Sequence, residues 1–572
     1  MRNKTEKNKI RVLAVHIIFS GLLIIFSGLY SCVPASAFDL SDIPANGREA
    51  QLPLNLEICL MDGVRTAEIK VLKAFKVNIY SPKDELKKSF SGSGLLLKIS
   101  EVKKSVPAKI QYYPVLSTFP YTSVLKPEKN EQILLKLGEL EKAAGKLKFF
   151  TYGCVLKKKD SVLKIDTRSV FACAAPKSSE EDARKFCDKM REENKISAFV
   201  HPVLITRPSC VISASFSCKD AKGVESEEKI ETSGRIEIVQ DYEVHIAKME
   251  FGRGDSWHNF KTARYSGNII ISTDNSGLGQ MINVTGLEDM LKIVVPSEIE
   301  PGSPYQSICA QAIAARSEIF TKYKSRHTDA DYDFCAGTHC QAYGGLANRT
   351  SSAVKAVDET AGKIIVSNGH IVDTVYHADC GGVTEDSNRI WSAPYDPSLV
   401  KISDTIEKTE YDFSTDEAKL RDFIKNPPAT YCSVAGACNN PDKFRWIRSF
   451  TQEEIDKMIE KQFKIGGLKE IRILERGKSG RITALELVGN SRTERVYKEL
   501  PIRKLFGMLR SALFVLDVSG NGAQRKYAFS GAGWGHGVGL CQDGAKGMGL
   551  SGKNCEEILL HYFSEAKIIK ME

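Results

Sequence analysis

One acidic residue of this chain stands where a carboxylate could carry chemistry. Glu298 follows an apolar run, residues 291–295, that predicts a strand ended by Pro296. We therefore expect Glu298 near the end of a strand, where the chain turns to the surface and catalytic residues are common. Glu300, the other nearby acid, is interpreted as a solvated loop charge.

A helix is expected directly after this carboxylate. Ser303 is a suitable N-cap, Pro304 suits the first helical position, and Gln306 stands where a capping box has Glu or Gln. The helix should therefore begin near Pro304. Its apolar residues recur at helical spacing and predict one buried stripe: Ile308, Ala312, Ala315, Ile319 and Tyr323. Gln311 and Arg316 are polar groups on this otherwise compact helix.

Cysteine and histidine form a second group of candidate residues. The spacing Cys-x4-Cys at Cys335 and Cys340 encloses His339, and His377 with Cys380 follows later. Thiolate and imidazole are ligands that Zn²⁺ prefers, although this spacing is not that of a common zinc finger. A Cys335–Cys340 disulfide and free thiols remain alternatives. The chain has no His-Glu-x-x-His, which argues against an ordinary zinc peptidase.

The end of the chain is rich in glycine. Eight glycines lie between Gly531 and Gly549, together with Trp534, His536 and Gln542. They do not form Gly-x-Gly-x-x-Gly after a strand, and no Gly-Lys-Ser/Thr follows, so a nucleotide site is not indicated. An exposed Trp beside glycine turns suits sugar recognition. The alternative is a buried Trp with a hydrogen-bonded core histidine.

The elements around these residues predict an α+β protein. At 572 residues, two or three domains are expected, and 42% hydrophobic with 26% charged residues is typical of globular proteins. Alternating runs predict a β-rich N-terminal region over 38–230, in which residues 178–205 form a small α/β unit. The charged segment 219–233 is the best linker candidate. The rest, 231–572, is a mixed α+β domain with an elaboration at about 392–525.

The first 37 residues have the order of an export signal. Basic residues precede an uncharged run from Val12 to Ala37 that ends in Ala-Ser-Ala. A cleaved signal, an uncleaved membrane anchor and a lipoprotein cut before Cys32 are the three alternatives. Each places the rest of the chain outside the cytoplasm, in the periplasm or cell wall. Residues 1–37 carry five basic residues and one acidic residue, so the formal charge of +9 falls to +5 without them.

This mild basic excess is compatible with an anionic cell-wall polymer and indicates no nucleic-acid partner. Fifteen cysteines would be unusual as idle thiols in an exported protein, so disulfides are expected for most of them. Cys432 and Cys438 flank a short loop that a disulfide could close. Cys210 and Cys218 lie on one alternating run, where each would pair with another strand.

Several motifs occur in an order that resembles a known family. They are residues 295–299, 310–316, 338–343, 377–384, Trp391, residues 533–539, Gln542 and residues 544–545. Together they resemble the stage II sporulation protein D (SpoIID)/LytB amidase-enhancer family. The resemblance extends from about Arg235 to the C-terminus, covers 392–525 only in part, and leaves 38–230 outside it. It implies a SpoIID-like catalytic domain and a peptidoglycan lytic transglycosylase.

The resemblance assigns the catalytic acid to Glu298, although Ile299 stands where relatives have Met. Gln306 replaces a second glutamate common in relatives, which leaves Glu298 as the residue to test. Cys380 replaces a common Ser, which favours a metal site of Cys335, His339, Cys340 and Cys380. The expected substrate-binding residues are Gln311, Arg316, Gln341, Tyr343, His377, Trp534, His536 and Gln542. Gln311 and Arg316 could equally form internal hydrogen bonds.

The implied reaction cuts the β-1,4 bond from MurNAc to GlcNAc in glycan strands and leaves a 1,6-anhydroMurNAc end. Glu298 would first donate a proton and then accept one, so the reaction requires no cofactor. A structural zinc at the Cys/His cluster is a candidate. One alternative is a non-catalytic peptidoglycan-binding protein that enhances a wall amidase. Another is a zinc hydrolase that uses the Cys/His cluster. Membrane contact is expected only through the N-terminal segment, if it stays uncleaved or is lipidated.

Overall fold

The computed structural model describes residues 48–571, apart from residues 53, 122–126, 159–163, 220–222, 252–257, 392–394 and 408. Strands make up 42% of the chain and helices 26%, and most strands precede residue 290. The predicted α+β class with a β-rich N-terminal region is therefore confirmed. The expected export segment, residues 1–37, lies outside the described residues. Among the residues described, no helix is long and apolar enough to cross a membrane.

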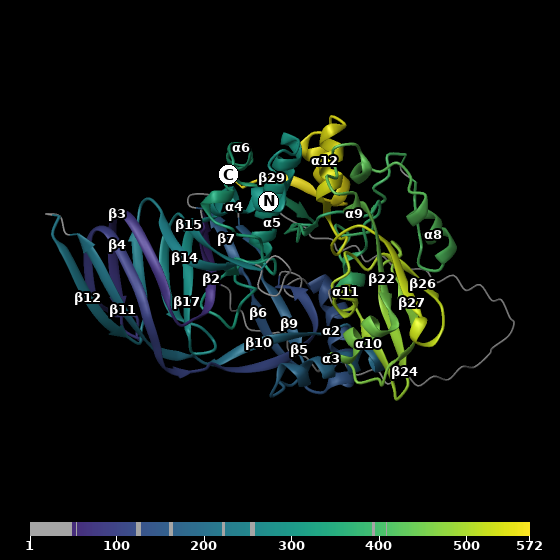
Figure 1. Ribbon diagram of the computed structural model, residues 1–572, viewed down its shortest axis with the longest axis horizontal. Coiled ribbons are helices and arrows are strands. Elements are labelled where there is room, and N and C mark those ends of the chain that lie inside the picture. Colours follow the sequence, from purple (N-terminus) through teal and green to yellow (C-terminus); the bar gives the residue numbers. More distant parts are fainter. Residues whose placement is uncertain are drawn as a thin grey trace, which may run out of the picture. The chain divides into compact units, whose positions relative to one another are not determined.

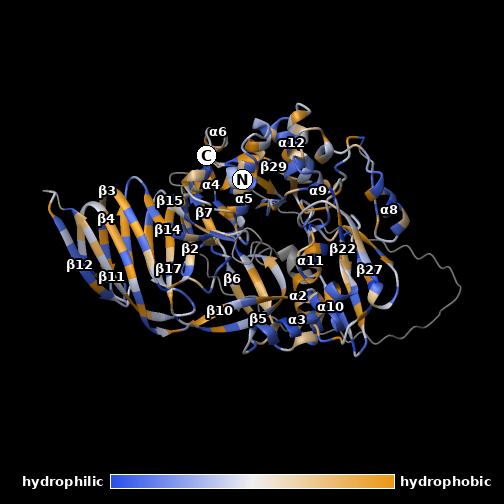
Figure 2. Cartoon of the chain, viewed as in Figure 1, coloured by the Kyte–Doolittle hydropathy of each residue, from blue (hydrophilic) through white to orange (hydrophobic). Residues whose placement is uncertain are grey.

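The largest element is an eleven-stranded sheet built mainly from the N-terminal half of the chain (Figure 1). Its strands are β2 (Asn55–Val64), β3 (Ala67–Tyr80), β4 (Leu86–Val106), β11 (Ser209–Lys219), β12 (Glu225–Thr232), β13 (Ile236–Gln240), β14 (Val244–Phe251), β15 (Asn259–Tyr265), β16 (Asn268–Thr273), β17 (Gly279–Gly286) and β18 (Phe334–Cys335). The main path runs β12-β11-β4-β3-β13-β16-β17-β2-β18, and β14 with β15 branches from β3. Apolar and polar residues alternate along these strands (Figure 2), as expected where one face packs on a core.

Strands from both sides of residue 230 pair within this sheet. β2 pairs with β17, so that Ile58 lies opposite Asn283, and β13 pairs with β3. One hydrophobic cluster continues from Leu54, through the helices that follow β17, to Met571. The N-terminal region and the part of the chain that carries Glu298 therefore share a buried core.

The segment expected to be a linker, residues 219–233, contains an edge strand instead. β12 pairs with β11, from Glu225 opposite Lys219 to Thr232 opposite Ile212. Within the described chain, no strand pairs with the other edge of β12. An edge strand leaves one row of backbone groups unpaired, and charged side chains discourage other chains from adding to it. The charges that indicated a linker belong to this exposed edge.

A smaller sheet contains the expected helix and strand of residues 178–205. α3 (Glu180–Asn194) begins after Ser179, whose side chain accepts a 3.1 Å hydrogen bond from the Asp182 N–H. β10 (Phe199–Thr206) follows and joins β5 (Lys109–Pro120), β9 (Ser169–Cys173) and β6 (Lys148–Tyr152). α2 (Pro127–Ala144) was not predicted. β1 (Arg48–Leu52), β7 (Cys154–Lys158) and β8 (Lys164–Asp166) form a separate three-stranded sheet.

Helix α5 (Tyr305–Lys322) is the central element of the following part of the chain. Its neighbours are α4 (Leu287–Glu298), α6 (Ser351–Glu359), β19 (Lys363–Ser367), α12 (Gln542–Leu550) and α13 (Cys555–Tyr562). The predicted apolar stripe is buried, but so is every other residue from Ser307 to Phe320. A helix that is enclosed on all sides positions its polar residues rigidly.

The predicted start of α5 near Pro304 is confirmed, but the predicted capping is wrong. Pro304 is itself the N-cap residue, and no side chain caps the helix. Ser303 Oγ has no hydrogen-bond partner among the described residues. Gln306 accepts a 2.9 Å hydrogen bond from the Cys555 backbone N–H. Gln306 therefore connects α5 to the start of α13 instead of closing a capping box.

The expected elaboration at residues 392–525 contains the predicted helices and hairpin. These are α8 (Glu417–Lys425), α10 (Gln452–Glu460), β23 (Leu468–Arg476) and β24 (Ile482–Gly489). They are accompanied by β22 (Arg445–Thr451), β25 (Thr493–Tyr497), α11 (Glu499–Leu505), β26 (Phe514–Ser519) and β27 (Lys526–Ala532). Most of these elements enclose a hydrophobic cluster of their own around Trp446, Phe514 and Phe529.

Candidate active site

Glu298 is the last residue of helix α4, so the strand expected before it is wrong. Gly286 stands at the N-cap, and six apolar residues from Leu287 to Val295 are buried. A short apolar run suits either a strand or a buried helix, and periodicity alone does not separate the two. Pro296 lies in the last turn of the helix. Glu298 thus stands at a helix C-terminus, whose partial negative charge favours a protonated carboxyl group.

The Glu298 carboxyl group is surrounded by protein, although the residue keeps partial exposure to solvent. Its Oε1 accepts a 2.7 Å hydrogen bond from the Ala342 backbone N–H. Burial raises the pKa of Glu298 to about 7, the Ala342 N–H opposes this rise, and the charge of Glu318 adds to it. An acid with a pKa near the working pH can both donate and accept a proton in one reaction.

A second carboxyl group that the sequence analysis did not select lies near Glu298. Glu318 on α5 forms an ion pair with Lys322 one turn later and accepts a 2.8 Å hydrogen bond from Gln341 Nε2. Gln341 also donates to the Ala315 carbonyl at 3.2 Å. Because Gln341 precedes Ala342 in the chain, these bonds position the N–H that holds Glu298. Glu318 is therefore placed to support the site rather than to act as a second free carboxylate.

Tyr376 is a further site residue that the sequence analysis missed. Its hydroxyl is buried and has no hydrogen-bond partner in the described part of the chain. Burial raises the pKa of Tyr376 well above its usual value, and the charges of Glu298 and Glu318 add to this rise. The hydroxyl therefore lies within electrostatic reach of both carboxyl groups. The only sequence signal was an aromatic residue directly before His377.

The glycine-rich tail packs against the strand that carries Tyr376. β21 (Tyr376–His377) pairs in parallel with β28 (Leu540–Cys541). Gly535 has a φ of +108°, and a Cβ at this position would lie 2.9 Å from the His377 Cβ. Glycine is required here by both the backbone conformation and the close approach. The glycines of the tail thus bring His536 and Trp534 next to β21.

Three aromatic rings form a row beside Tyr376. The His536 ring lies 4.9 Å from the Trp391 ring and 5.3 Å from the His377 ring. His536 Nε2 donates to the Tyr376 carbonyl at 2.9 Å, and its Nδ1 accepts from the Val538 N–H at 3.1 Å. Burial lowers the pKa of His536 to about 3, so the ring is neutral at physiological pH. His536 therefore fixes the Tyr376 backbone and is not placed to exchange protons.

Four predicted substrate-binding residues keep groups that a ligand could use. Trp534 is 38% exposed, and the Arg510 guanidinium lies 4.5 Å from the centre of its ring. His377 Nδ1 donates to the Val538 carbonyl at 3.1 Å. Polar atoms without a hydrogen-bond partner among the described residues are His377 Nε2, Gln311 Nε2 and Gln341 Oε1. These three atoms are enclosed in the structure, so of the four residues only Trp534 presents its side chain to solvent.

Gln542 connects α12 to α5, because its Nε2 donates to Gln311 Oε1 at 3.3 Å. Arg316 and Tyr343, by contrast, are engaged inside the protein. The fully buried Arg316 guanidinium donates to both carboxylate oxygens of Glu288, at 2.8 and 2.7 Å. The Tyr343 hydroxyl donates to Asn283 Oδ1 at 2.8 Å. These contacts fit the internal alternative for Arg316 and place Tyr343 in the core.

Glu300 differs from the solvated charge that we expected. Its Oε2 lies 3.2 Å from the Lys546 ammonium group on α12 and accepts a 2.6 Å hydrogen bond from Asn439 Nδ2. Its side chain is 43% exposed. Glu300 is therefore a paired surface carboxylate, in contrast to the enclosed Glu298.

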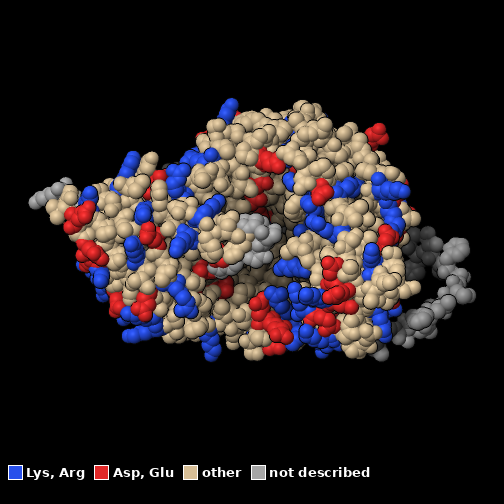
Figure 3. All heavy atoms as spheres, in the orientation of Figure 1, with Lys and Arg blue, Asp and Glu red and all other residues tan. Residues whose placement is uncertain are grey.

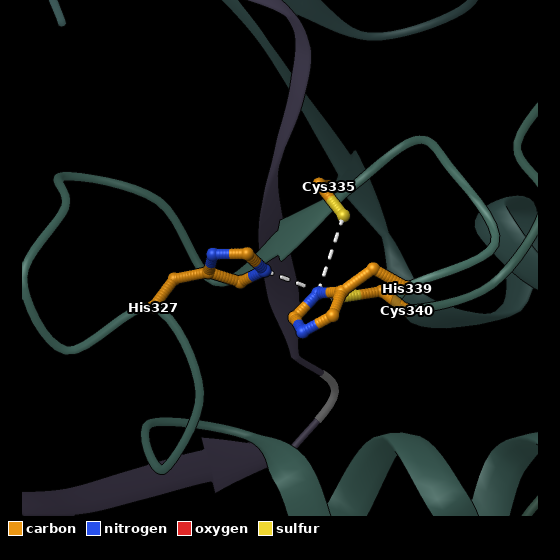
Figure 4. Close-up of side chains that lie close together, drawn as sticks. All are labelled: His327, Cys335, His339 and Cys340. Carbon is orange, nitrogen blue, oxygen red and sulfur yellow. Dashed lines mark hydrogen bonds between the residues drawn. The ribbon is translucent and has the colours of Figure 1, made fainter. Parts of the chain in front are cut away.

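The predicted Cys/His cluster forms, but with different members. Cys335, His339 and Cys340 lie together with His327, which the sequence analysis missed, whereas Cys380 belongs to another cluster. Figure 4 shows the two histidine rings and two sulfur atoms gathered in one place. His327 Nε2 lies 3.1 Å from Cys340 Sγ, and His339 Nδ1 lies 3.7 Å from Cys335 Sγ (Figure 4). His327 stands eight residues before Cys335, a spacing that carries no recognisable signal.

These four residues fit a structural zinc site. Their ligand atoms all lie within 4.8 Å of one another, and tetrahedral Zn²⁺ separates sulfur and nitrogen ligands by about 3.5 Å. A hydrogen bond from the Cys340 thiol holds the pKa of Cys335 at about 6, as a thiolate ligand requires. Two thiolates and two imidazoles would complete the coordination of the ion. No position would remain open for a reacting water.

All fourteen described cysteines are free thiols, so the disulfides expected from the sequence are not present among them. Cys432 and Cys438 lie in different side-chain clusters. Cys210 Sγ lies 3.2 Å from Thr273 Oγ1, and Cys218 Sγ lies 3.6 Å from Ser226 Oγ.

Two open pockets lie elsewhere on the described chain, and neither is lined by Glu298. One of about 370 Å³ is lined by residues that include Asp62, Asp274 and Tyr332, and one of about 380 Å³ by residues that include Arg191 and Lys498. Figure 3 shows acidic and basic residues mixed over the visible face rather than one continuous basic patch. The candidate site is therefore defined by its side chains.

Comparison with protein families agrees with this arrangement. Residues 275–366, which include Glu298, α5 and the His327 cluster, match the SpoIID family, described as stage II sporulation protein. This match assigns residues 275–366 to the SpoIID family. Residues 385–539, which include Trp391, Trp534 and His536, match a domain of unknown function, DUF8618.

Two curated proteins resemble this SpoIID-family chain. An uncharacterized protein of Brachyspira hyodysenteriae is 26% identical over 291 residues, which cover 50% of this chain and 68% of that protein. An amidase enhancer of Bacillus subtilis (strain 168) is also 26% identical, over 293 residues that cover 48% of this chain and 39% of the relative. The chain thus matches well under half of the amidase enhancer's length.

Proposed function

We propose that this SpoIID-family chain is a lytic transglycosylase that cleaves the MurNAc–GlcNAc β-1,4 bond of peptidoglycan glycan strands. The observation that carries the proposal is the setting of Glu298, a partly exposed residue whose enclosed carboxyl group has a pKa that burial raises to about 7. Such a group is protonated often enough near neutral pH to act as a general acid.

One carboxyl group is sufficient for this reaction. Glu298 donates its proton to the glycosidic oxygen as the C1–O bond breaks, and the GlcNAc hydroxyl leaves. The resulting carboxylate then accepts the proton of the muramic acid C6 hydroxyl, whose oxygen bonds to C1 and closes the 1,6-anhydro ring. The proton returns to Glu298, and no water is consumed. A hydrolase would instead divide the work between two carboxyl groups.

Neighbouring groups support sugar binding at this position. Trp534 offers an exposed ring to a sugar face, and the buried side chains of Gln311 and Gln341 each keep one amide atom without a hydrogen-bond partner among the described residues. Glu318 is engaged by Lys322 and Gln341, which argues against its acting as a nucleophile. These features favour a single-acid mechanism over two-carboxylate hydrolysis.

A non-catalytic role is the second candidate, because one relative is named an amidase enhancer. In that role the same surface would bind glycan strands and bring a wall amidase to them without bond cleavage. Both candidates place the protein outside the cytoplasm, at the cell wall. Only catalysis requires the Glu298 proton.

We also propose that His327, Cys335, His339 and Cys340 hold a structural Zn²⁺ ion. Four protein ligands fill a tetrahedral site, which argues against the zinc hydrolase that the sequence left open. Removal of the zinc should lower the melting temperature. Digestion of glycan strands in oxygen-labelled water should give products without the label, whereas a zinc hydrolase would introduce labelled oxygen.

The test compares the wild type with Glu298→Gln on purified glycan strands, with and without stem peptides. Mass spectrometry of the products should find 1,6-anhydroMurNAc ends for the wild type and a loss of at least 100-fold for Glu298→Gln. Glu300→Gln is the matched control, because this nearby carboxylate is exposed and paired with Lys546. It should retain wild-type activity.

Two results would contradict catalysis. Equal yields from the wild type and Glu298→Gln, or no anhydro ends from either, would leave the binding role. In that case both proteins should still bind glycan strands in a pull-down and stimulate an added wall amidase equally.

A further inference from the structure

A second group of sulfur ligands lies apart from the His327 cluster. Cys380, Asp404, Cys432 and Cys541 are all fully buried, and their ligand atoms lie within 4.8 Å of one another. They come from four separate segments: the loop after β21, the loop at residues 403–405, the short helix η3 (Tyr431–Ser433) and the end of β28.

The spacing of these atoms suits one tetrahedral ion. Cys380 Sγ lies 3.7 Å from Cys432 Sγ and 3.4 Å from Asp404 Oδ2. Zinc–sulfur bonds of about 2.3 Å place two sulfur ligands about 3.8 Å apart in a tetrahedron. Three thiolates with one carboxylate form a donor set that favours Zn²⁺ over the hard ions Mg²⁺ and Ca²⁺.

Backbone N–H groups already point at two of the sulfur atoms. The Gly382 N–H donates to Cys380 Sγ at 3.3 Å. The N–H groups of Cys380 and Gly544 both donate to Cys541 Sγ at 3.2 Å. Hydrogen bonds of this kind stabilise a thiolate more than a neutral thiol, and they are the usual outer shell of a metal-bound sulfur.

Two side chains orient the carboxylate of Asp404 through its Oδ1 atom. Asp404 Oδ1 accepts a 2.7 Å hydrogen bond from the Tyr562 hydroxyl, and His561 Nε2 lies 3.3 Å from the same oxygen. The other oxygen, Oδ2, is left to face the cysteines. A Cβ at Gly544 would lie 2.0 Å from the Tyr562 hydroxyl and 2.9 Å from Asp404 Oδ2. Only glycine fits there, so the outer partners are tightly packed.

Two guanidinium groups, that of the buried Arg481 and that of the half-buried Arg445, face the loop that carries Cys380. Arg481 donates to the Cys380 carbonyl at 2.9 Å, and Arg445 donates to the Gly381 carbonyl at 3.1 Å. Three thiolates, one carboxylate and Zn²⁺ carry a net charge of −2. Two nearby positive charges offset it, which reduces the cost of burying the centre.

We propose that Cys380, Asp404, Cys432 and Cys541 bind a second structural Zn²⁺ ion. Binding displaces the thiol protons to solvent and leaves no open coordination position. The ion joins the loop that follows His377 to the start of α12, where Gln542 contacts Gln311. It would therefore hold two candidate substrate-binding residues in register.

The rival interpretation is a Cys380–Cys432 disulfide. Its formation would remove two electrons and two protons to an oxidant, and it would leave Cys541 as a lone thiol. Peptide mapping distinguishes the two interpretations. Alkylation of the denatured, unreduced protein in the presence of chelator should modify all three cysteines. A Cys380–Cys432 cross-linked peptide in the purified protein would overturn the proposal.

Native mass spectrometry of the full chain, purified with zinc, provides the direct test. Cys432→Ser should lose one zinc per chain relative to the wild type. Cys218→Ser, a matched control outside both clusters, should lose none. Cys335→Ser removes a ligand of the His327 cluster. This variant should still bind the second zinc ion, which Cys432→Ser loses. An unchanged zinc count in folded Cys432→Ser would overturn the proposal.

X-ray absorption of the wild type keeps the test decisive if Cys432→Ser does not fold. The His327 cluster alone supplies two sulfur neighbours per zinc, whereas the second centre supplies three. An average above two supports the proposal, whether one or both sites are filled. An average of two or less overturns it.

Discussion

At the scale of single residues, the setting that raises the pKa of Glu298 to about 7 also costs stability. The folded chain binds this proton more tightly than the unfolded chain, in which a glutamate titrates near 4.3. Between about pH 4.5 and pH 7 the folded state therefore holds more protons, and the free energy of unfolding falls as pH rises. Above pH 7 the penalty is fully present.

Glu298→Gln should remove this penalty. The free energy of unfolding of the variant should exceed that of the wild type by a margin that is about 1–3 kcal/mol larger at pH 8 than at pH 5. Urea unfolding of both proteins at the two pH values measures the difference. The activity of the wild type should fall as pH rises through about 7, because the acid is then deprotonated. A stability difference independent of pH would contradict this account of Glu298.

Tyr376 offers a separate test at this scale. Its buried hydroxyl has no hydrogen-bond partner by geometry among the described residues, and the charges of Glu298 and Glu318 both act on it. In the proposed reaction it would donate a hydrogen bond to the reacting carboxyl group. Tyr376→Phe should lower kcat by about 10- to 150-fold, the loss of one hydrogen bond to a charged group, with little change in unfolding. Tyr343→Phe is the control: it loses a bond to Asn283 and should lower stability but not kcat. Unchanged kcat in Tyr376→Phe would exclude the role.

The sequence identified Glu298 because one motif carries the residue and its neighbours. It did not identify Tyr376, Glu318 or His327, because each enters the site through a contact that no local spacing encodes. The hydroxyl of Tyr376 comes near Glu298 only when β21 and β28 are paired. Cys380 was placed in the wrong cluster for the same reason, since its partners follow it by tens of residues.

At the scale of elements, an ion pair between the fully buried Arg316 and the partly exposed Glu288 joins α4 to α5. Arg316 donates two hydrogen bonds to Glu288 and is fully enclosed. Arg316→Met should destabilise the protein by about 3–5 kcal/mol, because Glu288 loses its partner. The double variant Arg316→Met/Glu288→Met should recover part of this loss, as urea unfolding would measure. Activity per folded molecule should change little, whereas a substrate-binding Arg316 would raise KM at unchanged stability.

Local signals predicted α5 but not α4. The Ser-Pro punctuation and helical spacing placed the start of α5 near Pro304, where it is observed. The apolar run before Pro296 suits a strand or a buried helix equally, and packing against α5 decides between them. The capping prediction failed because Gln306 contacts α13, which lies far along the chain.

At the scale of the whole molecule, the large sheet connects the N-terminal region to the SpoIID-family part. A fragment of residues 231–572 would lose β2 and β3 and expose the edges of β17 and β13. We expect it to aggregate, or to unfold without a cooperative transition in a thermal scan, whereas the full chain unfolds cooperatively. A soluble fragment with the melting temperature of the full chain would mean that the region is dispensable for folding.

The sequence did not predict this shared sheet. Residues 38–230 carry strand patterns, but alternation does not reveal which strands pair across the chain. The charges of residues 219–233 suggested a linker because a solvated edge strand and a linker have similar composition. The α+β class was predictable from local patterns, and the topology was not.

The order in which these strands are made has a consequence for how the chain folds. β2 has to wait for β17, and β19 has to wait for β29 (Lys567–Lys570), the last strand of the described chain. Pairing between such distant segments slows folding, because the entropy of closing a long loop is lost before the stabilising contacts form. The large sheet should therefore stay incomplete until β17 has been made, and the small sheet of β19 until synthesis is nearly complete. For a protein proposed to cross a membrane before it acts, that delay would keep the chain unfolded and competent for export.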